Sequence, residues 1–413
     1  MEQNVSKSYK YWVLFTLFLG WLIASMDRAV MSIALIPLTE EFGLNPATTG
    51  IVMSSFFLGF IIMQFPGGFL ADKYGAKKVL LIAIISWSLF TGLTGLAWSL
   101  TALLVFRFLF GIFEGFFPSA SSILVAQNFP LTQRARAKTI VLLASGVGGI
   151  LAAVGGAALV ESLGWRAMFW ILSGFGVLIF LLFVFKVQDH HKAKKQDDIV
   201  TKEPVHKVPV REVLKNPLVW SLLVTSLGIY IVNWGISSWM PIYLVQARGL
   251  SMMEMGTLIA ISGLIMMVVA LLVGYILDKI TGKERYAAAG GAVFAALFLY
   301  LLANAPTPVM AVVYQTLAQA ACSFVTFTVL TQPLKRFPVE AIGTANGIIN
   351  TGGQIGSFVS PMAMGFIIQA SGGSYTSAFM FLAACTVISA IAGATIPVVK
   401  TPAKSGPAAG AEA

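Results

Sequence analysis

The chain has 413 residues, of which 57% are hydrophobic and only 11% are charged. Together with a mean hydropathy of +0.85, this composition lies outside the range of water-soluble domains and indicates an integral membrane protein. The net charge of +10 at neutral pH would also fit a nucleic-acid-binding protein, but the basic residues are spread along the chain rather than gathered in one patch. We therefore expect the lipid bilayer as a partner and no nucleic acid.

Apolar runs follow one another along almost the whole chain. Each has about 20 residues or more, the length that an α-helix needs to cross the hydrocarbon core of a bilayer. The first run follows a charged leader and is too long for the core of a signal peptide, so we expect it to remain as the first span. Twelve spans are predicted, over residues 12–36, 50–70, 79–99, 102–127, 139–160, 167–186, 218–245, 256–277, 286–303, 309–332, 342–369 and 376–399.

Lysine and arginine are distributed unevenly between the two sides of this predicted topology. Of the 27 basic residues, 23 lie in the termini or in loops on the same side as the termini. Only Arg166 and Arg248 lie in loops on the opposite side. Because cytoplasmic loops carry the excess of lysine and arginine, the sequence predicts that both termini are cytoplasmic. We expect a multi-pass protein of the cytoplasmic (inner) membrane of a bacterium.

One long polar segment, residues 188–217, interrupts the apolar runs and contains all three histidines, His190, His191 and His206. A charged segment of this kind favours a solvated linker over a metal site, so we predict no bound metal. The tail "TPAKSGPAAGAEA" is predicted to be disordered. The expected organisation is an N-terminal six-helix bundle over 1–187, a central cytoplasmic loop over 188–217, a C-terminal six-helix bundle over 218–400 and a disordered cytoplasmic tail over 401–413.

The two halves of the chain resemble each other. "GFLADKYG" in the first half is echoed by "GYILDKITG" in the second. Duplicated helical units of this kind are typical of secondary transporters. The sequence therefore predicts an all-α integral membrane fold with two pseudo-symmetric six-helix bundles. Three pairs of residues share one separation of 206 positions, namely Gly68 and Gly274, Asp72 and Asp278, and Gly146 and Gly352.

The segment "GGFLADKYGAKKV" (67–79) resembles the signature loop between helices 2 and 3 of the major facilitator superfamily. This resemblance implies a cytoplasmic latch, in which Asp72 helps to hold the two bundles together when the carrier is open to the outside. The alternative is a helix-ending glycine turn whose charges only set the topology. The residues assigned to the cytoplasmic gate are Gly68, Asp72, Gly75, Lys77, Lys78 and Asp278.

Four ionisable residues lie well inside predicted spans, Asp27 and Arg28 in the first and Arg107 and Glu114 in the fourth. A charge at the centre of a bilayer costs about 2.5–3.5 kcal/mol on insertion scales. Arg107 and Glu114 are seven residues apart and therefore share one face of their helix. A static cluster that only fixes helix packing is the alternative, but apolar residues would pack these helices without the desolvation penalty. We therefore expect the four charges to be functional.

The segments "MDRAVMSIA", "FRFLFGIFEGFFPSA" and "WMPIYLVQARGLS" resemble the anion:cation symporter family, which includes sugar-acid permeases and vesicular sialic-acid and glutamate carriers. The resemblance implies that Arg28 and Arg107 attract the carboxylate of an organic anion. It implies that Asp27 and Glu114 are the protonatable coupling acids. Side-chain chemistry agrees, because arginine keeps its proton and grips a carboxylate with two prongs. The chain departs from the sugar-acid permeases at Ser25, Val147 and Gln354, so we predict the wider class of organic anions, of which sugar acids are one group.

Polar, uncharged residues line single helix faces in the second half. Tyr230, Asn233 and Trp234 share one face of the seventh span, and Asn346, Asn350 and Gln354 repeat every four residues in the eleventh. Hydrogen bonding between helices would explain such residues. We favour cavity lining and predict that the substrate contacts Tyr230, Asn233, Trp234, Asn350 and Gln354.

The predicted function is proton-coupled uptake of a small carboxylate-bearing organic anion by alternating access. The chain is expected to act as a monomer without a cofactor, with the proton as coupling ion and sodium as an alternative. A proton-coupled exporter or exchanger of amphipathic compounds is the first rival. A nontransporting nutrient sensor is the second, and it is disfavoured because we would expect a large soluble extension. We predict no enzyme, since the sequence has neither a GxxxxGK[ST] phosphate loop nor an HExxH motif.

Overall fold

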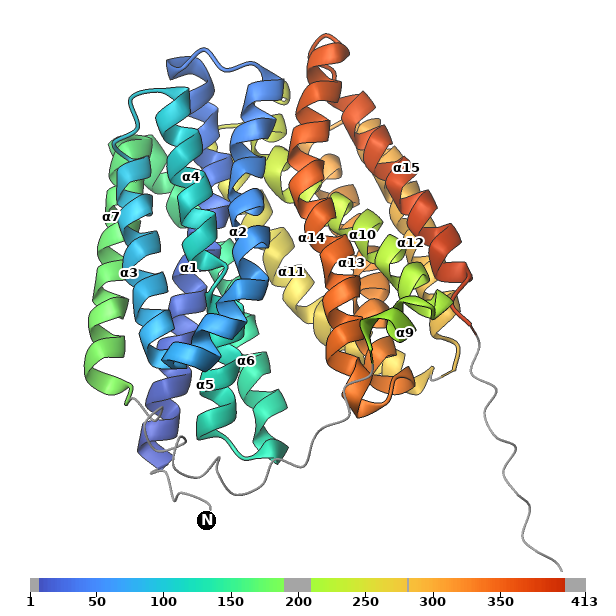
Figure 1. Ribbon diagram of the computed structural model, residues 1–413. Coiled ribbons are helices and arrows are strands. Elements are labelled where there is room, and N and C mark those ends of the chain that lie inside the picture. Colours follow the sequence, from blue (N-terminus) through green and yellow to red (C-terminus); the bar gives the residue numbers. More distant parts are fainter. Residues whose placement is uncertain (1–6, 189–208, 281, 398–413) are drawn as a thin grey trace, which may run out of the picture.

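The computed structural model describes residues 7–188, 209–280 and 282–397. These residues form a bundle of long helices (Figure 1). The helix α1 begins and α15 ends at the same end of the bundle, which we call the terminal face, and the opposite end is the far face. The first described helix therefore begins, and the last one ends, on one side of the molecule. The three histidines of the predicted linker and the predicted disordered tail lie outside the described residues.

The first half consists of seven α-helices and one π-helical turn among the described residues. The helices α4 and α5 make a single crossing that is broken near Gly115. The π-helical turn η1 joins α6 to α7 without leaving the helical path. The elements are α1 (Lys7–Glu41), α2 (Pro46–Tyr74), α3 (Ala76–Thr94), α4 (Leu100–Glu114), α5 (Phe117–Asn128), α6 (Leu131–Leu151), η1 (Ala152–Gly156) and α7 (Ala157–Lys186).

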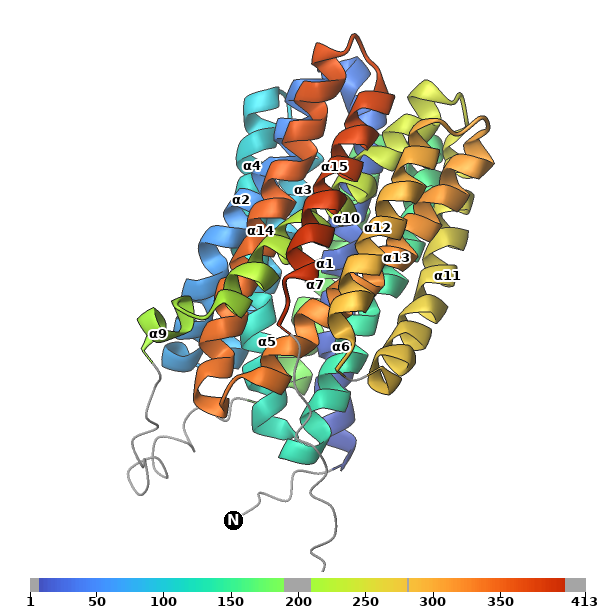
Figure 2. The same ribbon diagram turned by 90° about the vertical axis from the view of Figure 1, so that its right-hand side faces the viewer.

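The second half repeats this plan. The helix α11 begins 206 positions after α2, which is the separation found between the sequence motifs. Figure 2 shows α12 beside both α13 and α15, and these helices are in contact. The described elements are α9 (Val210–Leu214), α10 (Pro217–Ile242), η2 (Tyr243–Ala247), α11 (Met252–Lys279), α12 (Glu284–Ala303), α13 (Pro308–Arg336), α14 (Val339–Ala370) and α15 (Tyr375–Ala394).

Within the described residues, ten helical segments are long and apolar enough to cross a membrane. One of them, Thr132–Lys186, has 55 residues and at 1.5 Å per residue would be about 80 Å long, more than twice the hydrocarbon thickness. Gly164 breaks it with φ of 82°, a conformation that glycine adopts without strain, so this segment crosses twice. The 32-residue α14 supplies a further crossing. The prediction of twelve spans in two six-helix bundles is confirmed.

Side-chain caps start four of the helices at the far face. Asn45 accepts a hydrogen bond from the backbone of Thr48 at the start of α2, and Ser251 and Glu254 form a capping box at the start of α11. Such caps satisfy the backbone N–H groups that a helix start leaves open. Ser99 and Thr307 cap α4 and α13 in the same way. Side-chain caps therefore complete the starts of these four helices at this face.

The two halves meet tightly near the far face. A Cβ on Gly50 of α2 would lie 2.5 Å from the carbonyl oxygen of Pro361, and one on Gly365 of α14 would lie 2.4 Å from that of Pro46. Glycine at both positions lets the backbones of α2 and α14 touch, as small residues do at membrane helix interfaces. Ser54 also donates a hydrogen bond to the carbonyl oxygen of Phe358, at 2.7 Å. We call this contact the far-face seam, and it closes the centre of the molecule on that side.

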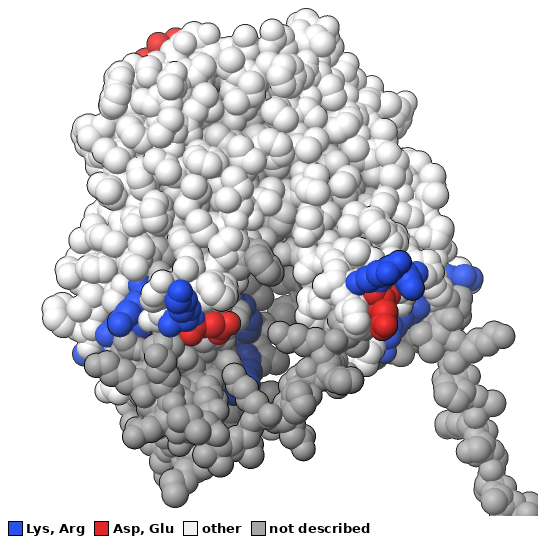
Figure 3. Space-filling view, in the orientation of Figure 1, with Lys and Arg blue, Asp and Glu red and all other residues white. Residues whose placement is uncertain are grey.

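At the terminal face the two halves are separated by a hollow. Figure 3 shows it between the two sides of the molecule, with lysine and arginine around its rim. The upper part of the same view carries almost no charged surface. Among the described residues, the two halves are therefore apart at the terminal face and in contact at the far-face seam.

Candidate functional site

The four intramembrane charges form two ion pairs between α1 and α4. Arg107 lies 2.8 Å from Asp27, and Arg28 lies 3.0 Å from Glu114. Neighbouring residues of α1 thus pair with residues two turns apart on α4. The sequence predicted all four charges inside membrane spans, and the structure brings them together.

Glu114 is the last residue of α4, and the chain itself explains why the helix ends there. Pro118, at the start of α5, has no N–H to donate to the carbonyl of Glu114, and its ring would clash with that carbonyl in a continuous helix. The break leaves Glu114 fully buried, facing α1. Pro118 therefore determines where α4 ends and, with that, where Glu114 lies.

The Asp27–Arg107 pair is sealed inside the first half. Both side chains are 2% exposed. Thr91 of α3 donates a hydrogen bond to the second carboxylate oxygen of Asp27, and the Arg107 guanidinium lies 4.7 Å from the ring centre of Phe110. A buried ion pair with additional hydrogen bonds of this kind holds its helices firmly, since losing either partner would leave an uncompensated charge.

The Arg28–Glu114 pair is less enclosed on the arginine side. The Arg28 side chain is 13% exposed, whereas that of Glu114 is fully buried. The guanidinium lies 5.0 Å from the ring centre of Trp21 and 6.0 Å from that of Trp234 on α10. Glu114 forms this ion pair, but neither of its carboxylate oxygens accepts a hydrogen bond from a described residue. Arg28 is therefore a cation between the two halves, held by a weakly satisfied carboxylate.

A short chain of hydroxyl groups links Arg28 to α6. Arg28 donates to the hydroxyl of Ser25 at 3.0 Å, and Ser25 lies 3.2 Å from the hydroxyl of Ser145. Gly148 permits this approach, since a Cβ there would lie 2.7 Å from the carbonyl oxygen of Leu22. The sequence analysis did not identify Ser145 or Thr91 as site residues, because a single hydroxyl in an apolar helix carries no distinguishing pattern.

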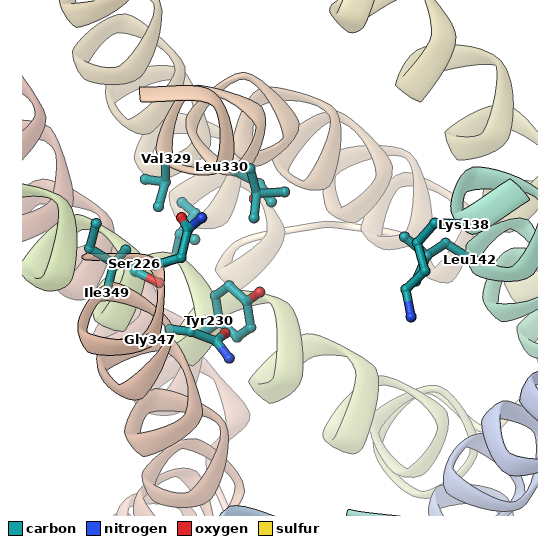
Figure 4. Close-up of a pocket in the computed structure, with 12 residues that line it drawn as sticks. Lys138, Leu142, Ser226, Tyr230, Val329, Leu330, Gly347 and Ile349 are labelled. Carbon is teal, nitrogen blue, oxygen red and sulfur yellow. The ribbon is translucent and has the colours of Figure 1, made fainter. Parts of the chain in front are cut away.

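A cavity of about 510 Å³ lies between α6 of the first half and α10, α13 and α14 of the second. This volume falls in the range of small-molecule sites. Figure 4 shows Lys138 and Leu142 across the open space from Tyr230. Its lining includes Lys138, Leu142, Ser226, Tyr230, Asn346 and Asn350. Tyr230 and Asn350 were predicted to contact substrate, and both face this cavity.

Lys138 is a cavity residue that the sequence analysis missed. The predicted span began at residue 139, which left Lys138 in a loop, but α6 begins at Leu131. The side chain is therefore two turns inside the helix. Its ammonium group donates to Ser122 at 2.8 Å, to Ser121 at 3.1 Å and to the carbonyl of Pro118 at 3.3 Å. Earlier placement of the helix start would have revealed it.

The other five residues predicted to bind substrate lie outside the cavity lining, and Arg28 and Arg107 are two of them. Trp234 packs against Phe57 of the first half, with ring centres 4.7 Å apart, and faces Arg28. Asn233 is half-buried on α10 and Gln354 is half-buried on α14, one turn beyond Asn350. Trp234 thus belongs to the surroundings of Arg28, and the roles of Asn233 and Gln354 stay predictions.

The predicted cytoplasmic gate forms the turn between α2 and α3. Gly75 has φ of 97°, a value that favours glycine, and Gly68 lies next to Ser119. Asp72 and Lys78 are exposed, and Asp72 makes no ion pair with a described residue. Lys77 donates to the carbonyl of Val184 at 3.2 Å. The side chain of Asp278 lies outside the described part of the chain, so the latch stays a prediction.

Comparison with known proteins identifies the family. The profile of the Major Facilitator Superfamily matches residues 17–361. A bacterial homologue of the human lysosomal transporter Spinster, in an inward-facing and unoccupied conformation, superimposes with a TM-score of 0.78 and 21% identity, covering 94% of this chain and 96% of that one. This chain belongs to the Major Facilitator Superfamily. It is a membrane transporter and not an enzyme.

Curated relatives carry the comparison further. A rice protein (Oryza sativa subsp. japonica) named as probable anion transporter 4, chloroplastic, is 32% identical over 90% of this chain. This chain spans 66% of the length of that relative. A probable sulfoacetate transporter of Cupriavidus necator is 29% identical, and the match covers 95% of this chain and 94% of that one.

Proposed function

We propose that the protein is a proton-coupled symporter that imports a small carboxylate-bearing organic anion by alternating access. The observation that carries the proposal is the Arg28–Glu114 pair, because a guanidinium that faces both halves is held there by a fully buried carboxylate. The names of the relatives support the class of substrate, since one is an anion transporter and another a sulfoacetate transporter. Coupling and direction are inferred from the residues.

Exchange of partners at Arg28 couples proton to anion. While Glu114 is deprotonated, its carboxylate is paired with the guanidinium of Arg28. Protonation of Glu114 removes that negative charge and frees the two prongs of Arg28 for a carboxylate. The anion then replaces Glu114 as the countercharge, so that no charge is left unpaired in the low-dielectric interior. Deprotonation of Glu114 reverses the exchange and releases the anion.

Asp27 and Arg107 form a second couple with the same chemistry. In the conformation described here, this pair is sealed and Thr91 holds the second oxygen of Asp27. Its partner exchange is therefore tied to the rearrangement that opens the far-face seam. In this proposal Arg107 contacts the anion, and Asp27 takes up a proton, only when α1 and α4 move apart.

The orientation follows from the distribution of basic residues. If the terminal face is cytoplasmic, as the positive-inside rule predicts, the cavity is open to the cytoplasm. The structure, in which Arg28 is paired with Glu114, then represents the state that follows release of the substrate. We place the carrier in a bacterial inner membrane as a single chain that needs no cofactor.

Transport in proteoliposomes tests the coupling. Radiolabelled sulfoacetate, glucarate and glucuronate serve as probes, and the experiment measures counterflow and accumulation driven by an imposed pH gradient. We expect Glu114→Gln to keep counterflow and to lose proton-driven accumulation, because glutamine cannot exchange a proton. Glu161→Gln, which changes an exposed acid on α7, is the matched control and should behave as wild type. Full proton-driven accumulation by Glu114→Gln contradicts the proposal.

The same vesicles separate the rival readings. A sodium gradient that drives accumulation without a pH gradient would assign the coupling to sodium. If the pH gradient drove the probes only in the direction opposite to uptake, the result would favour the exporter. Absence of movement of every probe, together with absence of binding, would contradict transport of organic anions.

A further inference from the structure

Lys138 is a basic residue at the cavity whose charge no acidic side chain in the described part of the chain neutralises. The four intramembrane charges cancel in two ion pairs. Lys138 has no carboxylate partner among the described residues, because its contacts are two hydroxyl groups and a backbone carbonyl. These oxygens satisfy its hydrogen bonds but leave its positive charge in place. Lys138 and the four intramembrane charges together therefore sum to +1 when Glu114 is deprotonated and to +2 when Glu114 is protonated.

The position of Lys138 relative to Arg28 follows from α6. Ser145 is seven residues beyond Lys138, so both lie on the same helix face, about 10 Å apart along the axis. Ser145 contacts Ser25, which accepts a hydrogen bond from Arg28. Lys138 is thus on the same wall as the Arg28 cluster and closer to the terminal face. The flexible lysine stem can shorten or lengthen this separation.

The wall opposite Lys138 offers neutral hydrogen-bonding groups. Tyr230, Asn346 and Asn350 line the cavity, and Figure 4 shows Tyr230 across from Lys138. The amides of Asn346 and Asn350 have no protein hydrogen-bond partner among the described residues. Free amides can bind the hydroxyl or carbonyl groups of a ligand. The cavity therefore has a charged group, Lys138, on one wall and neutral polar groups on the other.

We propose that Lys138 is a second anion-binding residue, and that the carrier prefers organic dianions whose two acid groups engage Arg28 and Lys138. This inference rests on the proposed function. When Glu114 is protonated, a dianion balances both positive charges. A monoanion leaves Lys138 without a countercharge in a partly desolvated cavity, where an unpaired charge is costly. Selectivity for two acid groups therefore follows from the charge count of the site.

A purely structural role for Lys138 predicts a different outcome. Its hydrogen bonds to Ser121, Ser122 and Pro118 tie α6 to α5. If this tie were its only task, replacing Lys138 would alter all ligands equally, whatever their charge. The comparison of matched anions separates the two roles.

Binding of matched pairs of anions to the purified full-length protein tests the proposal. Glucarate and gluconate have the same six-carbon polyhydroxy chain with two carboxylates or one, and sulfoacetate and acetate supply a shorter pair. Calorimetry gives the Kd of each. We expect wild type to bind the dianion of a pair more tightly. Lys138→Gln should weaken dianion binding about tenfold, the size expected for one charged hydrogen bond, and leave the monoanion within about twofold.

Two further variants complete the experiment. Lys138→Arg keeps the charge and should restore most of the preference for the dianion. Arg136→Gln removes an exposed base two residues away on α6 and should change neither Kd. Unchanged monoanion binding by Lys138→Gln shows that this variant is folded. The proposal is overturned if Lys138→Gln weakens the binding of both anions equally or of neither. It is also overturned if the wild type binds both members of every pair with equal affinity.

Failure of this inference is distinguishable from failure of the proposed function. If Arg28→Gln abolishes binding of an anion while Lys138→Gln has no charge-dependent effect, the proposed function stands and the role of Lys138 is wrong. If no probe binds and none is transported, both are wrong.

Discussion

The helices α1 and α10 contact each other at the centre of the molecule. The polar residues of α1 at this place are charged, whereas those of α10 are neutral. At the separation of 206 residues that relates the two halves, Asn233 and Trp234 of α10 occupy the positions of Asp27 and Arg28 of α1. An ionisable pair in one half thus corresponds to a neutral amide and an indole in the other. Trp234 even faces Arg28, with 6.0 Å between the ring centre and the guanidinium carbon.

The second charged helix shows the same contrast. Arg107 and Glu114 of α4 correspond to Val313 and Ala320 of α13 at the same separation. The duplicated backbone plan is kept, whereas the charges are confined to one copy. Because both ion pairs are complete within the first half, partner exchange needs no acid or base from the second. The second half contributes neutral polar groups that can recognise the uncharged part of a ligand.

The largest expected effect tests whether the sealed pair of the first half is structural. Arg107→Gln leaves Asp27 buried without its countercharge and should lower the free energy of unfolding by about 3–5 kcal/mol. Thermal unfolding of the purified protein measures this. Arg166→Gln is the matched control, since the Glu41–Arg166 pair is 39% exposed and should contribute less than about 1 kcal/mol. Asp27→Asn combined with Arg107→Gln should recover part of the loss. Equal effects of Arg107→Gln and Arg166→Gln would contradict the assignment.

The next effect tests whether the partly exposed pair serves binding. Arg28→Gln should weaken anion binding about 100-fold, because removing one partner of a buried charged contact costs about 2–5 kcal/mol. Arg28→Lys should restore little, since an ammonium cannot grip a carboxylate with two prongs. The loss of stability should be smaller than for Arg107→Gln, because the Arg28 side chain is 13% exposed whereas that of Arg107 is 2% exposed. Wild-type affinity in Arg28→Gln would show that the anion binds elsewhere.

The fold was predictable because hydrophobic length and a repeated motif are properties of the sequence itself. Span lengths gave the twelve crossings, and the separation of Gly68 from Gly274 predicted the start of α11 relative to α2. The break between α4 and α5 was not predicted, although Pro118 is visible in the sequence. A proline inside an apolar run can kink a helix or end it, and tertiary packing decides which.

The site was only partly predictable. The cost of burying charge drew attention to Asp27, Arg28, Arg107 and Glu114, but which arginine meets which acid depends on the rotation of α1 and α4. The sequence likewise could not show that Arg107 is sealed while Arg28 is partly exposed. Lys138 was missed because helix starts are the least certain feature of a sequence-based assignment, and an error of eight residues placed it in a loop.

A smaller effect tests whether the halves are held together at the far-face seam. Gly365→Ala would place a methyl group 2.4 Å from the carbonyl oxygen of Pro46, which should disfavour the closed seam about tenfold, within the range of overpacking costs. The readout is maleimide labelling of Ser54→Cys, a buried seam position, with Cys322 and Cys385 replaced by alanine. Gly343→Ala on the same helix has open space around it and is the control. Unchanged labelling in Gly365→Ala would mean that the contact does not limit opening.

The smallest effect tests the contact that joins the charged half to the neutral one. Trp234→Leu removes the ring that faces Arg28 and keeps an apolar side chain against Phe57. A cation–π contact of this separation contributes about 0.5–1 kcal/mol, so anion affinity should change about two- to fivefold. Trp21→Leu removes the indole at 5.0 Å on α1 itself and provides the comparison within one half. If Trp234 joins the halves around Arg28, its replacement should also slow exchange between conformations, measured as counterflow rate, whereas Trp21→Leu should change affinity alone. If the two variants behaved identically, Trp234 would contribute packing alone. The charges of the first half would then act without a specific contact from the second half.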